Sequence, residues 1–390
     1  MVRDLAWKIL INVLNKKETL KVQNFDNNLS DNDKAFLKLL VYSTIRHINK
    51  LEFVLSKFVK KRPDKDIKAL LLLGITQILF IDVPAHACLF ETVEVIKKSK
   101  FKNNASFVNG VLRNVLRNKE IPDISNFPSS FEKVLSKDYN KDEISLLSKE
   151  LEQEPSLDIS VKSDVSNWAS ELDGEIIENN TIRLNNPRQI FNLNGYDNGD
   201  WWVQSFAASL PVFMFSDLKN KKVADFCAAP GGKTAQILNM GGKVQAFDIS
   251  NKRIKTLKEN IERLKFKDIK IINANPCEFE FNEKFDAILV DAPCSGTGTL
   301  RKNPDVVLKN IDFKNLEKIQ FKLLETALLN VNINGEVVYS TCSLMKKEGE
   351  LLVKQVLNNF KDFSLVKEKR VFPDNKYQEG FYMALLKRIK

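Results

Sequence analysis

Histidine is almost absent from this chain of 390 residues: it has only two, His47 and His86, and both lie in the first quarter. A histidine-based catalytic triad and a histidine-rich metal centre are therefore excluded from the later part of the chain. Five cysteines are present, at positions 88, 227, 277, 294 and 342, and no two of them form a C-x-x-C pair. This argues against a disulfide framework and against a zinc site. Any chemistry in the later part of the chain must therefore come from cysteine, aspartate and lysine.

Long apolar runs are also missing. The chain has no stretch of 18 or more apolar residues, and its longest run, Leu70–Leu73, continues through Gly74 and Gln77 as a buried helix would. Because a membrane-spanning helix needs about 20 apolar residues, we expect no membrane partner. The start, Met1–Trp7, contains Asp4 and has amphipathic spacing, which is not the pattern of a signal peptide. We therefore expect a cytoplasmic protein.

The net charge of +10 is unevenly distributed along the chain. Residues 1–120 contain 22 lysines and arginines against 12 aspartates and glutamates, whereas residues 121–390 contain 38 of each. A basic module joined to a neutral one favours an anionic partner for the basic module, most simply nucleic acid. A general bias towards solubility is the alternative explanation.

Apolar periodicity predicts a multidomain protein of three parts. Residues 1–125 show helical spacing throughout and predict an all-α bundle, and residues 126–198 predict helices followed by a small α+β unit. Residues 199–390 alternate between strand and helix patterns, which predicts an α/β domain with a doubly wound sheet. The expected strands of that domain lie near 222–226, 243–248, 268–273, 285–290, 335–340 and 380–387, and its helices near 203–216, 233–240, 251–264, 312–330 and 347–360.

A loop of small residues follows the first of these strands and opens a helix. It reads Cys227-Ala228-Ala229-Pro230-Gly231-Gly232-Lys233-Thr234. Small residues let the backbone approach a ligand, and a helix N-terminus favours anionic groups. Asp248 ends the next strand, where an acid commonly accepts hydrogen bonds from ribose hydroxyls. These features predict a site for an adenosine cofactor. The alternatives are a P-loop, although Cys227 replaces its first glycine, and a glycine turn without a ligand.

Two cysteines lie in loops after apolar strands. Cys294 ends the box Asp291-Ala-Pro-Cys294, and Cys342 lies in Ser340-Thr-Cys342-Ser343. Since the carboxyl ends of parallel strands share one edge of a sheet, both thiols and the cofactor loop should face one pocket. Thiolates are nucleophiles whose pKa falls near cations, and Lys233 is the candidate cation. Asp291 could hydrogen-bond a flat, amino-bearing ring. Lone cysteines are usually small buried hydrophobes, and we expect this of Cys88, Cys227 and Cys277.

Four segments together resemble the RsmB/Sun (NOL1/NOP2/Sun) family of RNA cytosine methyltransferases. They are Cys227–Lys233, the two cysteine boxes and the terminal segment Glu379–Ala384. Ser106–Asn114 resembles the signature of a NusB-like RNA-binding domain, and the resemblance covers nearly the whole chain. It implies an all-α NusB-like domain at 1–125, an RRM-like α+β unit within 126–198, and a Rossmann-like class I methyltransferase at 199–390.

The resemblance also implies the chemistry. The cofactor would be S-adenosyl-L-methionine, with no metal, and the product 5-methylcytosine in small-subunit (16S) ribosomal RNA. Cys342 resembles the attacking cysteine and Cys294 the cysteine that helps to release the product. The implied cofactor contacts are Cys227, Ala228, Ala229, Pro230, Gly231, Gly232, Lys233, Asp248, Asn275 and Asp291. Asn275 stands where the family usually has Asp, Trp201–Ser205 departs from the family pattern, and Asn303-Pro-Asp305 matches a loop near the substrate.

Several alternatives remain open at this point. The substrate could be a transfer RNA or large-subunit ribosomal RNA, or the chain could be a non-catalytic RNA-binding factor. A DNA cytosine methyltransferase would attack from the Pro-Cys box, and an adenine N-methyltransferase would need an Asn/Asp-Pro-Pro-Tyr/Phe box where Ala292-Pro-Cys294 stands. We expect a monomer without an obligate protein partner.

Overall fold

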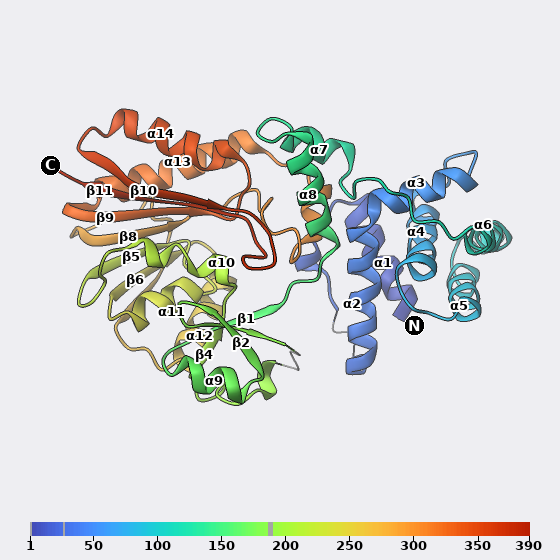
Figure 1. Ribbon diagram of the computed structural model, residues 1–390, viewed down its shortest axis with the longest axis horizontal. Coiled ribbons are helices and arrows are strands. Elements are labelled where there is room, and N and C mark those ends of the chain that lie inside the picture. Colours follow the sequence, from blue (N-terminus) through green and yellow to red (C-terminus); the bar gives the residue numbers. More distant parts are fainter. Residues whose placement is uncertain (1, 26–27, 186–189) are drawn as a thin grey trace. The chain divides into compact units, whose positions relative to one another are not determined.

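A computed structural model describes residues 2–25, 28–185 and 190–390 of the chain (Figure 1). It divides into two compact units. The helical unit comprises Met1–Glu154 with Leu300–Asn310, and the sheet unit comprises Pro155–Thr299 with Ile311–Lys390. The helices at 129–135 and 141–152 group with the helical unit, whereas the strands from 157 onward group with the sheet unit. The division into three domains at 125 and 198 stays a prediction.

The described part of the helical unit contains no strands, which confirms the all-α prediction for the first domain. α4 lies at its centre, with buried residues along nearly its whole length, and it packs against α1, α2, α3, α5 and α6. Asp64 starts α4 by accepting a hydrogen bond from the Asp66 backbone N–H at 2.8 Å. The elements are α1 (Val2–Asn15), η1 (Leu20–Val22), α2 (Asp31–Arg46), α3 (Ile48–Phe58), α4 (Lys65–Leu79), α5 (Ala85–Lys97), η2 (Lys102–Asn104), α6 (Ala105–Arg117), α7 (Ser129–Leu135), α8 (Lys141–Glu152) and η5 (Pro304–Leu308).

Two glycines in this bundle should respond oppositely to alanine. A Cβ on Gly110, in α6, would meet no described atom within 4 Å, so Gly110→Ala should stabilise the helix by about 0.5–1 kcal/mol. A Cβ on Gly74, in α4, would lie 2.7 Å from Leu112 Cδ2, so Gly74→Ala should destabilise the bundle by about 1–3 kcal/mol. Urea titration followed by circular dichroism measures both, and equal shifts in the same direction would contradict this packing.

The loop Asn303-Pro-Asp305, expected near the substrate, belongs to the helical unit. The buried Arg46 donates through Nη2 to the Arg301 carbonyl at 2.6 Å, and Arg301 pairs with Glu150 at 2.6 Å. Asp305 accepts a hydrogen bond from the Leu20 backbone N–H at 3.3 Å. The short helix η5 is therefore held by buried polar contacts to α2, α8 and η1.

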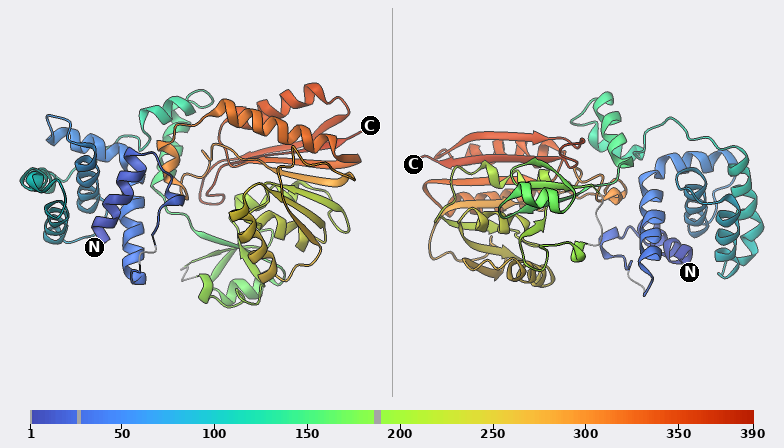
Figure 2. Two further views of the ribbon diagram at one scale, coloured as in Figure 1. Left: turned by 180° about the vertical axis from the view of Figure 1, so that it is seen from behind. Right: turned by 60° about the horizontal axis from the view of Figure 1, so that its bottom comes forward.

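The main sheet of the sheet unit has helices on both faces (Figure 2). Over the described residues its seven strands lie in the order β10-β11-β9-β8-β5-β6-β7. The strands β9, β8, β5, β6 and β7 are parallel to one another, and β11 pairs antiparallel with both β9 and β10. α10, α11 and α12 pack on one face and α13 and α14 on the other. This confirms the predicted doubly wound α/β fold. The elements are β5 (Lys222–Phe226), α11 (Gly232–Asn239), β6 (Lys243–Asp248), α12 (Asn251–Arg263), β7 (Ile269–Asn273), β8 (Phe285–Asp291), α13 (Phe313–Leu329), β9 (Val331–Thr341), η6 (Lys346–Glu348), α14 (Glu350–Asn359), β10 (Phe363–Val371) and β11 (Phe381–Arg388).

Two details of the predicted pattern were wrong. Instead of one helix near 203–216, the structure has β4 (Trp201–Val203), α10 (Phe206–Ser209) and η4 (Val212–Met214). Pro211 explains the break, because proline cannot donate the backbone hydrogen bond that a continuous helix needs. The strand β10 was missed, since its sequence carries Lys367-Glu-Lys-Arg370 on an exposed sheet edge and lacks apolar alternation.

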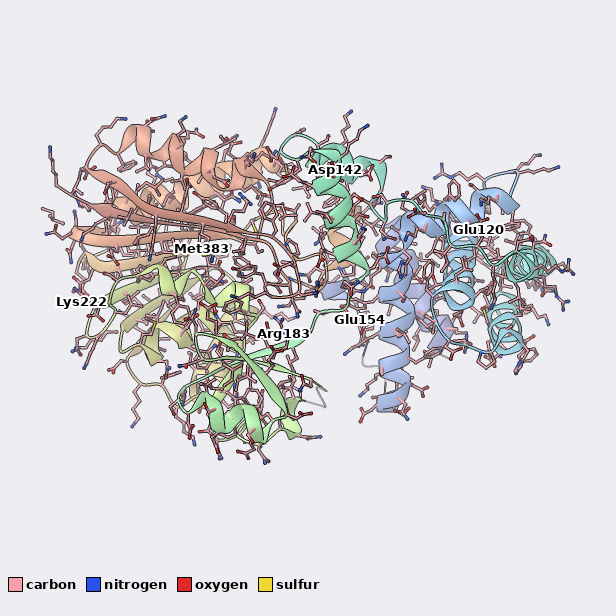
Figure 3. All side chains as sticks on the ribbon, in the orientation of Figure 1. Glu120, Asp142, Glu154, Arg183, Lys222 and Met383 are labelled. Atoms are coloured by element: carbon pink, nitrogen blue, oxygen red, sulfur yellow. The ribbon has the colours of Figure 1, made fainter. Side chains whose placement is uncertain are left out.

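A second, smaller sheet confirms the predicted α+β unit. Its strands run antiparallel in the order β2-β3-β1-β4, from β1 (Leu157–Val161), β2 (Gly174–Glu178), β3 (Thr181–Leu184) and β4, and α9 (Val165–Glu171) packs on it. Arg183 (labelled in Figure 3) pairs with the buried Asp158 at 2.8 Å and donates to the carbonyl of Lys376. Asp158 in turn accepts the Phe206 backbone N–H at 3.0 Å, which fixes the small sheet onto the start of α10.

None of the described helices is long and apolar enough to cross a membrane.

Candidate active site

Four neighbouring strands of the main sheet end in register. Phe226 of β5 lies opposite Phe247 of β6 and Val290 of β8, and Val290 lies opposite Tyr339 of β9. The loops that follow these residues leave from one edge of the sheet, as the sequence predicted from the polarity of parallel strands. They carry the cofactor loop, Asp248, the Asp291 box and the Cys342 box.

The two cysteines of these loops are in contact. Cys294 Sγ and Cys342 Sγ lie 3.2 Å apart, and both side chains are partly buried. The Gly298 backbone N–H donates to the Cys342 carbonyl at 3.0 Å, and the Gly380 N–H donates to the Gly298 carbonyl at 2.8 Å. A Cβ on Gly298 would overlap the carbonyl oxygen of Gly380, so only glycine lets these loops approach so closely.

The surroundings of the two thiols make them unequal. The hydrogen bond with Cys342 and, next, burial raise the pKa of Cys294 well above its ordinary value, and the nearby Glu348 carboxylate acts in the same direction. Two sulfurs at this distance do not both lose their protons, because like charges in contact repel. Cys294 is therefore the sulfur of this pair that is held protonated.

A lysine–aspartate pair lies beside the thiols. Lys233 Nζ is 2.8 Å from Asp291 Oδ2, and Ser340 Oγ donates to Asp291 Oδ1 at 2.9 Å. Burial opposes the charge of Lys233, but the Asp291 carboxylate and, to a smaller extent, Cys342 raise its pKa above the ordinary value. The ammonium also lies 5.2 Å from the ring centroid of Phe381. Lys233 thus remains a cation that favours negative charge on Cys342.

The cofactor loop is held in a tight turn by its own backbone and by α12. The Ala228 N–H donates to the Phe247 carbonyl at 3.0 Å, and the Gly231 N–H donates to the Ala228 carbonyl at 2.9 Å. Gly231 has a φ of +106°, and a Cβ there would lie 2.5 Å from Leu257 Cδ1. Gly232 then opens α11 next to Lys233. The side chain of Arg253 donates to the Ala229 carbonyl, which completes the turn.

Cys227 stands in this loop without being activated. Burial raises the pKa of its thiol to about 12, and its side chain packs against the apolar cluster of β5 and β6. Its backbone has a φ of +62°, and its role as a cofactor contact stays a prediction.

Asp248 and Asn275 differ in how they are held. Asp248 is buried, and its carboxylate accepts the backbone N–H groups of Ala229 at 3.3 Å and Ser250 at 2.9 Å. Asn275 follows β7 and forms a local turn. Its Oδ1 accepts the Cys277 N–H at 3.1 Å and its Nδ2 donates to Glu278 at 2.7 Å. Asp248 thus hydrogen-bonds to the backbone of the loop from the end of β6, while both polar atoms of Asn275 bond within their own turn.

These residues fit an adenosine cofactor. The glycine turn brings the loop backbone close to the N-terminus of α11, and Asp248 supplies a carboxylate at the end of β6. Within the described residues, Asp225 Oδ1 is a buried acceptor that finds no donor, while Thr234 Oγ1 donates to Oδ2 at 2.6 Å. Asp225 has no exposed surface, so this oxygen does not contact a ligand at the loop.

Asp225 should make the stability of the sheet unit depend on pH. Burial raises its pKa to about 7, so the folded state binds a proton that the unfolded state has already lost. The contribution is complete below about pH 4 and disappears as the pH rises through 7, which amounts to about 3 kcal/mol between pH 5 and pH 8. Urea titrations at both values should show this decrease in the native protein and a much smaller one in Asp225→Asn. Equal pH slopes would contradict the burial of the carboxyl.

Sequence reasoning missed three residues of the site. Glu348 accepts hydrogen bonds from both cysteine loops, Arg370 donates to the Ser343 carbonyl at 2.7 Å, and Phe381 lies under Lys233. Phe381 belongs to the segment Glu379–Ala384 that carried the family resemblance, so it could have been found. Glu348 gave only a weak signal, an acid shortly after the second cysteine box.

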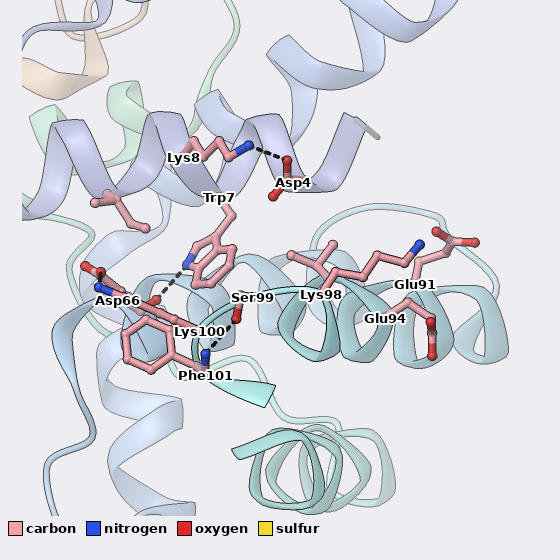
Figure 4. A pocket seen from close by; sticks show the side chains of 12 residues that line it. Asp4, Trp7, Lys8, Asp66, Glu91, Glu94, Lys98, Ser99, Lys100 and Phe101 are labelled. Carbon is pink, nitrogen blue, oxygen red and sulfur yellow. Dashed lines mark hydrogen bonds and ion pairs between the residues drawn. The ribbon is translucent and has the colours of Figure 1, made fainter. Parts of the chain in front are cut away.

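A separate cavity of about 610 Å³ lies in the helical unit (Figure 4). Trp7 and Phe101 line it, and the Trp7 indole donates to the Asp66 carbonyl at 2.7 Å. None of the predicted site residues belongs to it. The described residues also contain no cluster of three or more His, Cys, Asp or Glu side chains that could hold a metal ion.

Comparisons with known proteins match two parts of the chain. The model of the family "16S rRNA methyltransferase RsmB/F" matches residues 213–387, and that of the NusB family matches residues 1–117. Ribosomal RNA small subunit methyltransferase B of Proteus mirabilis is 29% identical over 99% of this chain and 98% of its own length.

Solved structures give the same picture of the fold. The crystal structure of PH0851 has a TM-score of 0.80 at 22% identity and covers 99% of both chains. A methyltransferase homologue from Pyrococcus horikoshii has a TM-score of 0.57 at 25% identity, over 67% of this chain and 99% of its own. Residues 213–387 of the chain are therefore similar to the RsmB/F methyltransferase family, and residues 1–117 are similar to the NusB family.

Proposed function

We propose that the protein transfers a methyl group from S-adenosyl-L-methionine to carbon 5 of a cytosine in small-subunit ribosomal RNA, through a covalent bond between Cys342 and the base. The observation that supports this most strongly is the pair of thiols 3.2 Å apart at the ends of β8 and β9, with the Lys233–Asp291 pair beside them. The names of the relatives support the choice of ribosomal RNA.

The cofactor would be held by the loop 227–233 and by Asp248. Asp248 would accept hydrogen bonds from its ribose, and the backbone of the loop would contact its amino acid part. When bound, the cofactor supplies an electrophilic methyl group on a sulfonium. Carbon 5 of the base can bond to this methyl group.

Cys342 would begin the reaction. Carbon 5 of a neutral cytosine is a poor nucleophile, but addition of the Cys342 thiolate to carbon 6 turns the ring into an enamine whose carbon 5 is nucleophilic. Lys233 would stabilise the thiolate by its positive charge. Asp291, held by Lys233 and Ser340, would accept a hydrogen bond from the exocyclic amine of the base.

Cys294 would complete the reaction. Once Cys342 is bound to carbon, its sulfur no longer carries a charge, and one of the causes that hold the proton on Cys294 disappears. Cys294 can then lose its proton to water and, as a thiolate, remove the proton from carbon 5. The electron pair of that C–H bond restores the ring double bond and expels the Cys342 thiolate. One proton leaves the base for each methyl group gained.

The substrate must present an unstacked cytosine to two sulfurs at the sheet edge. Unstacking costs a few kcal/mol unless the base already lies in a loop, so we propose a structured RNA with an accessible cytosine. The excess positive charge of residues 1–120 would contact phosphates, and RNA affinity should therefore fall as salt rises.

Bisulfite sequencing tests the proposal. The full-length protein is incubated with S-adenosyl-L-methionine and, separately, with small-subunit ribosomal RNA, large-subunit ribosomal RNA and transfer RNA. A protected cytosine in the small-subunit RNA alone is the expected result. A protected cytosine in one of the other RNAs would mean that the same reaction takes place on a different substrate. No protection in any RNA, with tight RNA binding, would favour a non-catalytic RNA-binding factor.

A further inference from the structure

We propose that Glu348 is a positioning residue that ties the two cysteine loops together and so fixes the distance between Cys294 and Cys342. Its consequence for turnover rests on the function proposed above, whereas its consequence for the spacing of the two sulfurs does not. The charged side chain of Glu348 accepts hydrogen bonds from both Ser295 and Ser343, one residue after each cysteine.

The carboxylate of Glu348 is buried, with 1% of the residue exposed, and it accepts four hydrogen bonds. Oε1 accepts the Ser295 backbone N–H at 2.9 Å and the Gln320 side-chain amide at 2.9 Å. Oε2 accepts the hydroxyls of Ser295 and Ser343, each at 2.5 Å. All four donors are neutral groups, so the carboxylate is held by hydrogen bonds and not by an ion pair.

These donors matter because of their place in the sequence. Ser295 directly follows Cys294, and Ser343 directly follows Cys342. The Ser295 and Ser343 hydroxyls are 3.1 Å apart, and Thr297 Oγ1 lies 3.1 Å and 3.2 Å from them. One carboxylate thus draws together the residues next to both thiols, beneath the contact between the sulfurs.

The main chain of Glu348 is fixed as well. Its carbonyl accepts the Tyr339 hydroxyl at 3.0 Å and the Thr341 hydroxyl at 3.2 Å, and both of these residues belong to β9. Gln320, on α13, also donates to the Pro293 carbonyl at 2.9 Å. The residue is therefore held by β9 through its carbonyl and by α13 through its carboxylate, in addition to the two loops that it joins.

A matched control exists on β9. Glu336 of this strand is also buried, and its carboxylate accepts the Ser216 backbone N–H at 3.0 Å and the Ser216 hydroxyl at 2.7 Å. It has the same kind of donors as Glu348 but lies at the other end of the parallel register, opposite Ala287 and not Asp291. Glu336→Gln therefore removes a comparable carboxylate without touching the cysteine loops.

Phenylarsine oxide measures the spacing without RNA or cofactor. One arsenic atom bonds to two thiol sulfurs, and its oxygen leaves as water with the two thiol protons, so the ring closes only when both sulfurs are close together. Native protein and Glu336→Gln should form the bridged adduct, detected by intact mass and by resistance to a monothiol. Cys294→Ser gives the baseline for a single sulfur.

The Glu348 variants decide the proposal. Glu348→Ala should lower the affinity for the arsenical about tenfold or more, and Glu348→Gln, which keeps the shape and one acceptor, should lower it about threefold. Adducts as tight as in the native protein in both variants, with native circular dichroism, would overturn the proposal. If Glu348→Ala does not fold, Glu348→Gln alone decides between these outcomes.

Turnover gives a second readout. With active protein, Glu348→Gln should lower kcat while KM for RNA stays the same, and should move the acidic limb of the kcat–pH profile to lower pH, because Cys294 acts as a thiolate and the carboxylate charge no longer raises its pKa. Glu336→Gln should change neither. The native protein could show no methyl transfer while the arsenical affinities of the variants follow the expected order. That result would refute the proposed function and leave the role of Glu348 intact.

Discussion

Replacement of Cys342 by alanine is expected to abolish methyl transfer, with a loss of rate of about 10³-fold or more. Cys342 lies beside Lys233, whose raised pKa reflects in part the nearby sulfur, and its partner Cys294 keeps the proton of the pair. Without this sulfur the proposed addition to carbon 6 does not take place, and carbon 5 remains unreactive. The loss should appear in kcat, since cofactor and RNA contacts stay in place.

Transfer of labelled methyl groups to RNA under single-turnover conditions measures this effect. Cys277→Ala is the control, because Cys277 lies after β7, away from both cysteine boxes, and packs against the apolar cluster of β5 and β6. It should retain native activity. If Cys342→Ala kept a rate within tenfold of the native rate, Cys342 would not be the nucleophile.

Replacement of Cys294 by alanine is expected to give the opposite behaviour, an RNA that stays bound to the protein. Methyl transfer still occurs once on each molecule, because Cys342 and the cofactor loop are unchanged. The proton on carbon 5 then has no thiolate within reach, and the bond between Cys342 and carbon 6 cannot break. Turnover should stop after one cycle, and nearly all active protein should become cross-linked.

Denaturing gels with labelled RNA show the cross-linked species as a band of reduced mobility. The double variant Cys294→Ala/Cys342→Ala should lack the band, since the sulfur that forms the bond is gone. Normal turnover of Cys294→Ala without a band would refute the assigned role of Cys294. A band that persists in the double variant would mean that another residue attacks the base.

The architecture of the sheet unit could be predicted from the sequence because its main determinants are local. Apolar runs such as Ala287–Val290 and Val337–Tyr339 form buried strands, and the helical patterns between them impose parallel pairing. The strand β10 and the break at Pro211 show the limit of this reasoning. A charged edge strand has no apolar alternation, and the two short elements around the proline are individually too short to show periodicity.

The candidate site was predicted in part. The polarity of parallel strands placed Lys233, Asp291, Cys294 and Cys342 at one edge, and the structure brings these four into two adjacent pairs. It does not do the same for Asn275, whose side chain bonds within its own turn. Whether Asn275 contacts the cofactor stays a prediction.

The sequence by itself determined which residues are candidates for the chemistry, namely cysteine, aspartate and lysine at the strand ends, and it determined that those ends share one edge. The tertiary structure decided the distances between these residues and their burial. The contact between the sulfurs at 3.2 Å, the closeness allowed by Gly298 and the buried carboxylate of Glu348 all depend on packing between segments far apart in the chain. Such packing sets burial and neighbouring charge, which control a thiol's pKa and which spacing along a sequence does not contain.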